Sequence, residues 1–79
     1  MNKYWRHPTA IGVARILFQN GQWHAVITDE FLGAYPIPEQ ALDDLVGGYT
    51  WSHSSGVDTS TLGLPDDLSE WELVNSTKR

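Results

Sequence analysis

The chain has 79 residues, a net charge of −5 and no cysteine. A chain of this length buries only about 60% of its extended surface, so it has room for one small domain, residues 1–79. The lack of cysteine excludes a disulfide framework and a thiolate metal site, and no apolar run approaches the roughly 20 residues that span a bilayer. No secretory leader pattern is present either, so we expect a cytoplasmic protein.

The first third of the chain predicts a β-hairpin. Asn20-Gly21 is its strongest turn signal, because both central positions of a type I′ turn need a positive φ. Strands are expected near 10–19 and 22–28. Residues 1–9 are expected to be a mobile or loosely docked lead-in, ending where Pro8 favours an extended His7. Within it, Trp5 is expected to cover an edge of the sheet, with an exposed anchor as the alternative.

A short strand and the main helix are expected next. A turn at Asp29-Glu30 leads to a strand near 31–35, which two prolines end. In the segment "PEQALDDLVGG", Pro38 suits a first helical turn, apolar residues share one face, and Gly47-Gly48 is a stop signal. These elements predict an α+β fold, a three- to four-stranded antiparallel sheet with one main α-helix packed on it.

The last third has weaker signals. Residues 49–64 are rich in Ser, Thr and Gly and predict a long surface loop, anchored by Tyr49, Trp51 and either Leu62 or Leu64. The segment "PDDLSE" favours one helical turn. The segment "EWELV" alternates as a strand does, which would point Trp71 and Leu73 inward and Glu70 and Glu72 outward.

No pattern of residues indicates an enzyme. The histidines His7, His24 and His53 lack the short spacings of metal ligands, and the serines lack a nucleophile elbow. The acidic pairs at 43–44 and 66–67 have the chemistry of metal ligands, but adjacent acids on a helix diverge by about 100° and favour a solvated face. We therefore expect no catalytic residue, no metal and no cofactor, with a metal-dependent enzyme built on His and Asp as a rival hypothesis.

The layout of charge is the most informative feature. Every Lys and Arg lies near a terminus, at positions 3, 6, 15, 78 and 79, whereas all ten acids lie between residues 16 and 77. Acids along one strand face would be about 6.6 Å apart, a pitch comparable to that of phosphates along a nucleic-acid strand. The sequence thus predicts an acidic face that imitates DNA and binds a basic protein surface. Its residues are expected to be Asp43, Asp44, Asp66, Asp67, Glu70 and Glu72, with Asp29, Glu30 and Glu39 adding to the field.

Two other interpretations remain open. The acids would serve solubility alone in an ordinary acidic protein. Alternatively, the protein is a small adaptor or regulatory domain that binds a partner through the 49–64 loop and exposed aromatic side chains.

The chain also resembles the small acidic anti-CRISPR proteins of phages, in particular an inhibitor of type I-C systems. The resemblance rests on "VARILFQNGQWHAVI", the acidic helix "PEQALDDLVGG" and the closing "GLPDDLSEWELV". It implies a non-enzymatic inhibitor in the bacterial host cell that imitates DNA, occupies a basic nucleic-acid-binding surface of a CRISPR surveillance complex and does not itself bind nucleic acid. No functional residue is carried over from that family.

Overall fold

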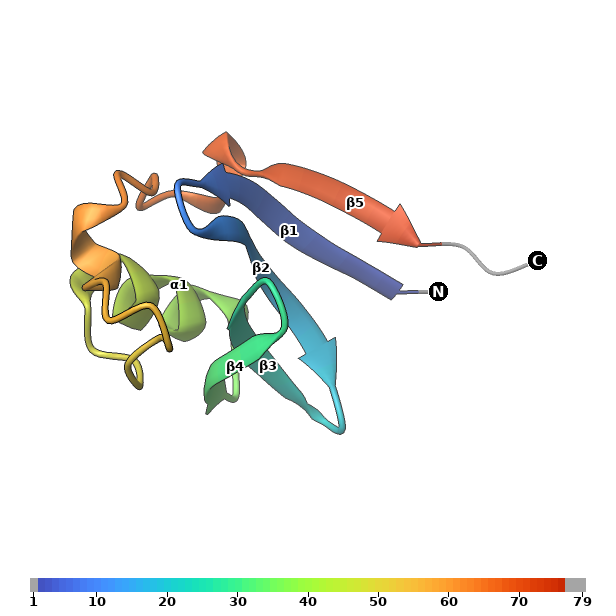
Figure 1. Ribbon diagram of the computed structural model, residues 1–79. Coiled ribbons are helices and arrows are strands. Elements are labelled where there is room, and N and C mark those ends of the chain that lie inside the picture. The colour runs from blue at the N-terminus through green and yellow to red at the C-terminus, as the bar shows by residue number, and fades with distance from the viewer. Residues whose placement is uncertain (1, 77–79) are drawn as a thin grey trace.

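The computed structural model describes residues 2–76 and shows a five-stranded sheet with one α-helix on one face (Figure 1). The strands are β1 (Asn2–Thr9), β2 (Gly12–Gln19), β3 (Gln22–Ile27), β4 (Glu30–Tyr35) and β5 (Glu72–Ser76), and their order in the sheet is β4-β3-β2-β1-β5. All four pairings are antiparallel. The α+β prediction is confirmed, but the expected three or four strands are five.

The predicted lead-in is wrong, because this segment supplies the additional strand. Residues 2–9 form β1, an interior strand that pairs with β2 on one side and with β5 on the other. The pairing with β5 extends only to Arg6, so Pro8 lies where β1 has one neighbour and a missing N–H is tolerated. Trp5 is half-buried in this interior strand, with its ring centroid 5.6 Å from that of Trp23, and so covers no edge. Met1 lies outside the described residues.

Local turn and stop signals are confirmed. Asn20 and Gly21 have φ values of 55° and 81° between β2 and β3, as a type I′ turn requires. The helix α1 (Pro38–Gly47) begins with its proline in the first turn and ends at Gly48, which has a φ of 78°. The turn predicted at Asp29-Glu30 is wrong by one residue: it lies at Thr28-Asp29, and Glu30 already pairs with Ile27 in β4. Thr28 has a φ of 57°, and its backbone N–H donates to the Val13 carbonyl at 3.0 Å.

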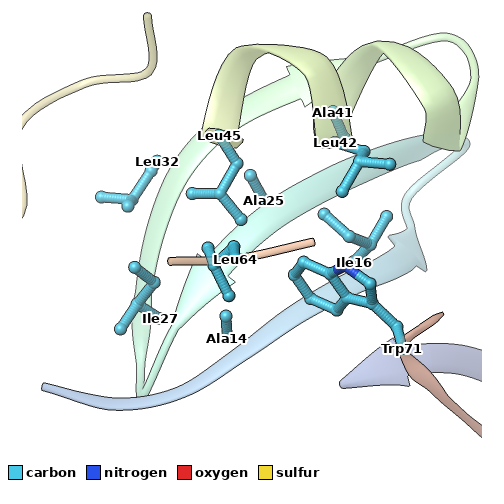
Figure 2. Packing of buried hydrophobic residues seen from close by; sticks show 10 residues of the cluster. All are labelled: Ala14, Ile16, Ala25, Ile27, Leu32, Ala41, Leu42, Leu45, Leu64 and Trp71. Carbon is cyan, nitrogen blue, oxygen red and sulfur yellow. The ribbon is translucent and has the colours of Figure 1, made fainter. Parts of the chain in front are cut away.

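The core lies between α1 and the sheet (Figure 2). The helix packs on β2, β3 and β4. Ala14, Ile16, Ala25, Ile27 and Leu32 contribute from the sheet, Ala41, Leu42 and Leu45 from the helix, and Leu64 and Trp71 from the segment before β5. Because each buried aromatic removes roughly 150–250 Å² from water, Trp71 contributes much of the apolar area of so small a core.

The closing segment differs in part from its prediction. The expected helical turn is the 3₁₀ turn η2 (Leu68–Glu70), and the strand begins only at Glu72. Trp71 points inward as predicted, but Leu73 is 47% exposed, because α1 packs on the β2–β4 half of the sheet. Glu70 and Glu72 therefore belong to different elements and do not share a strand face, contrary to the prediction.

Candidate functional site

Within residues 2–76, the Lys and Arg side chains belong to two neighbouring strands. Among the described residues, Lys3 and Arg6 are on β1, and Arg15 is on β2 directly opposite Arg6. Arg6 Nη1 lies 2.9 Å from Glu72 Oε1, and Arg15 Nη1 donates to the Thr28 carbonyl at 3.0 Å. Since neighbours of Arg6 and Arg15 along each strand face the helix, the two guanidinium groups extend from the opposite, uncovered face. The predicted site residue Glu72 lies with them and is neutralised by Arg6.

The three acids of α1 lie on two different sides of the helix. At about 100° per residue, Glu39 and Asp43 share the outer side of the helix and are exposed. Asp44 is half-buried on the flank that meets Tyr35 of β4. Burial, together with the Asp44 carboxylate beside it, raises the pKa of the Tyr35 hydroxyl to about 12. Asp44 therefore interacts within the fold, whereas Glu39 and Asp43 face solvent.

Three predicted acids gather around η2. Asp66, Asp67 and Glu70 are all exposed within five residues of chain. Asp67 caps the turn: its Oδ1 accepts from the Ser69 backbone N–H at 2.9 Å, and this bond holds the pKa of the Asp67 carboxyl below its usual value. Trp71 fixes the segment from inside, because its indole Nε1–H donates to the Pro65 carbonyl at 2.9 Å. The buried tryptophan thus holds the three carboxylates at the surface.

Glu30 and Asp29 have separate roles. Glu30, the first residue of β4, accepts hydrogen bonds from the hydroxyl and the backbone N–H of Ser54, and these lower the pKa of its carboxyl. The Glu30 carboxylate therefore holds the 49–64 loop in place. Asp29 lies exposed in the turn before β4. Of the predicted residues, Glu30, Asp44, Asp67 and Glu72 have partners inside the fold, and the others face water.

The 49–64 loop is held by polar contacts rather than by the expected aromatics. Tyr49 is 79% exposed and Trp51 is 74% exposed, so the predicted anchoring by these two side chains is wrong. Leu64 is buried in the core and Leu62 packs against it, as expected. The loop contains the 3₁₀ turn η1 (Thr59–Thr61), where the buried Thr59 hydroxyl donates to the Leu45 carbonyl at 2.7 Å.

His53 is the one histidine that the described structure buries. Its Nδ1 accepts from the backbone N–H of Ser55 at 3.0 Å, so the proton of the neutral ring is on Nε2, 3.5 Å from Glu30 Oε2. The Ser55 hydroxyl also lies 3.0 Å from Nδ1. This row of Ser55, His53 and Glu30 has the residue types of a catalytic triad. However, the Nδ1 lone pair is already shared with a backbone donor and has less capacity to accept the hydroxyl proton.

A hollow of about 200 Å³ at the C-terminal end of α1 was not predicted from the sequence. It is lined by Gly48, Thr50, Trp51, Ser52, Val57 and Asp58, among others. The carboxylate of Asp58 caps η1 by accepting from the backbone N–H and the hydroxyl of Ser60, which lowers its pKa. Asp58 followed by Thr and Ser is a local capping signal in the sequence, but its proximity to Trp51 depends on the tertiary fold.

Within residues 2–76, no group of three or more His, Asp or Glu side chains is arranged to hold a metal ion. In the same part of the chain, no helix has both the length and the apolar character needed to cross a bilayer. Comparisons with protein-family models, with curated proteins and with solved structures found no match to this chain.

Proposed function

We propose that this protein is a non-enzymatic inhibitor that binds a basic nucleic-acid-binding surface of another protein through its exposed acids. We define the anionic surface as the exposed acids of two elements, Glu39 and Asp43 on α1 and Asp66, Asp67 and Glu70 around η2. The resemblance to anti-CRISPR proteins supports a CRISPR surveillance complex as the partner. The protein then competes with DNA for the partner and does not itself bind nucleic acid.

The separation of charge is the observation that carries this proposal. The described Lys and Arg residues are restricted to β1 and β2, and within residues 2–76 Glu72 is the only acid in an ion pair with one of them. The five acids of the anionic surface are exposed, with no Lys or Arg near them in sequence. A surface for solubility alone intersperses both signs of charge. A field of one sign instead accelerates encounter with a partner of the opposite sign.

The fold also orients this field. The molecule is elongated, 38 Å along its longest axis and 21 Å along the other two. The C-terminal part of α1 and the 49–64 loop lie at one end, the start of β1 and the end of β5 lie toward the other, and η2 lies beside the start of β5 (Figure 1). Lys3 pairs with Asn75 toward the end of β5, whereas Arg6 pairs with Glu72, two residues after η2. In this proposal, the protein approaches a basic groove with the side that holds η2.

A pair of variants with equal net charge tests the proposal. Asp66→Asn with Glu70→Gln removes two charges from the anionic surface, and Gln19→Lys with Gln22→Lys adds two positive charges at the β2–β3 turn, where both glutamines are exposed. Affinity for a purified type I-C surveillance complex is measured by biolayer interferometry. We expect the first variant to lose about tenfold or more in affinity and the second to lose far less, because association follows local complementarity. Equal losses in both variants would show that net charge alone matters and would refute the proposed surface.

The adaptor hypothesis is a second candidate because Tyr49 is 79% exposed. Binding through an apolar contact of this kind would persist at about 0.5 M salt, where the Debye length is only about 4 Å. It would also be lost in Tyr49→Ala. Binding through the anionic surface would instead weaken steeply with salt and tolerate that substitution.

A further inference from the structure

The hollow at the C-terminal end of α1 combines three features that favour a cation. Its volume of about 200 Å³ is several times the roughly 30 Å³ share of one water molecule, so a side-chain head group fits there. Its lining includes Gly48, Trp51 and Asp58, and the Asp58 carboxylate lies beside Gly48. Each of these attracts positive charge by a different physical mechanism.

The helix end supplies the first attraction. The C-terminus of an α-helix carries a partial negative charge equivalent to about half an electron, and basic side chains usually offset it. The last turn of α1 contains no basic residue. Gly48, the C-cap, forms part of the wall of the hollow.

Asp58 supplies the second attraction. Its Oδ1 accepts two hydrogen bonds from Ser60, at 2.9 Å from the backbone nitrogen and 2.8 Å from the hydroxyl. These bonds fix the carboxylate against the wall and favour its ionised form. Within the described residues, no hydrogen bond to Oδ2 is present and no Lys or Arg forms an ion pair with Asp58.

Trp51 supplies the third attraction. Its backbone N–H donates to the Leu32 carbonyl of β4 at 3.0 Å, which fixes the main chain, while its side chain is 74% exposed. A tryptophan face is the aromatic surface that attracts cations most strongly. Exposure of so large an apolar side chain in a protein with such a small core is otherwise unfavourable.

We propose that this hollow receives the guanidinium group of an arginine side chain from the partner protein. The inference rests on the proposed function, because that function requires a partner rich in basic residues. Arginine fits better than lysine, since its planar guanidinium stacks on an indole and at the same time donates to a carboxylate. The hollow thus adds a specific arginine socket to the long-range attraction of the anionic surface.

The test uses blocked arginine, acetylated at its N-terminus and amidated at its C-terminus, as the probe. It is titrated into the ¹⁵N-labelled chain and followed by amide chemical shifts. We expect saturable shifts confined to residues 48–59, and none with blocked citrulline, which has the same shape without the charge. Asp58→Asn should weaken binding about tenfold and Trp51→Ala about fivefold. Asparagine is as good a cap as aspartate, so the Asp58→Asn variant keeps η1.

Asp66→Asn is the matched control, because it removes the same charge outside the hollow, and it should leave the affinity for blocked arginine unchanged. Equal binding of blocked citrulline, or equal weakening by Asp66→Asn and Asp58→Asn, would overturn the socket. Free arginine has an α-ammonium and an α-carboxylate that an arginine within a protein chain lacks, so its tighter binding would indicate a small-molecule site and would also overturn the assignment to a partner's side chain.

Failure of the socket is distinguishable from failure of the proposed function. A chain that binds the surveillance complex equally well with and without Asp58→Asn retains the proposed function and lacks the socket. A chain that prefers blocked arginine to blocked citrulline but does not bind the complex retains the socket chemistry and loses the proposed partner.

Discussion

Trp71→Phe tests how the acidic closing segment is attached to the core. Trp71 is 5% exposed and donates its indole N–H to the Pro65 carbonyl at 2.9 Å. The substitution removes this hydrogen bond, worth about 0.5–1.5 kcal/mol net. It also removes roughly two or three buried carbon-sized groups, at about 0.8 kcal/mol each. We expect the free energy of unfolding to fall by about 2–4 kcal/mol in total, a large share of the stability of a small domain.

The assay is urea denaturation followed by far-ultraviolet circular dichroism, with Trp51→Phe as the matched control. Trp51 is 74% exposed, so the same chemical change there should alter the free energy of unfolding by less than about 0.5 kcal/mol. An unchanged slope of unfolding free energy against urea would show that both variants unfold from comparable states. A loss below about 0.5 kcal/mol in Trp71→Phe, or equal losses in the two variants, would refute this account of the core.

Three further predictions follow from burial and ionisation. Leu45→Ala, at a fully buried helix position, should lower the free energy of unfolding by about 2–5 kcal/mol in the same urea assay. A loss below about 1 kcal/mol would contradict the packing of α1 on the sheet. Because the folded pKa of Tyr35 is raised to about 12, the free energy of unfolding in the urea assay should decline as pH rises from about 10 through 12, and Tyr35→Phe should make that decline smaller; an equal decline in the variant would contradict this. Because hydrogen bonds from Ser54 lower the folded pKa of Glu30, the ionised carboxylate stabilises the fold above pH 4.5, and this stabilisation is lost as the pH falls below that value. Melting temperatures that fall equally with acid in the native chain and in Glu30→Gln would contradict this.

The sequence predicted the elements whose signals are local. Asn20-Gly21 fixes its own turn because few other residue pairs tolerate two positive φ values, and Pro38 and Gly48 mark the ends of α1 by their own backbone preferences. The pairing of β1 with β5 has no such local signal, because it joins the two ends of the chain. Arg6 and Glu72, for example, are 66 positions apart. Sequence patterns alone therefore do not place residues 2–9 in the sheet.

The candidate site was predictable only in part, for the same reason. Composition identified the acids, but the contacts that occupy Glu30, Asp44 and Glu72 come from distant parts of the fold. The 3₁₀ turn η2 also interrupts the alternation that suggested a shared strand face for Glu70 and Glu72. The hollow beside Trp51 depends on a loop that folds back on the end of α1, which no periodicity in the sequence indicates.

Direct competition with DNA tests the central proposal most directly. A purified type I-C surveillance complex is incubated with a labelled target duplex and increasing amounts of the protein, and bound DNA is measured by electrophoretic mobility. We expect the protein to displace the duplex, with an apparent inhibition constant that rises in proportion to the duplex concentration. A complex that holds DNA and the protein together, or that keeps its DNA at saturating protein, would contradict the proposal.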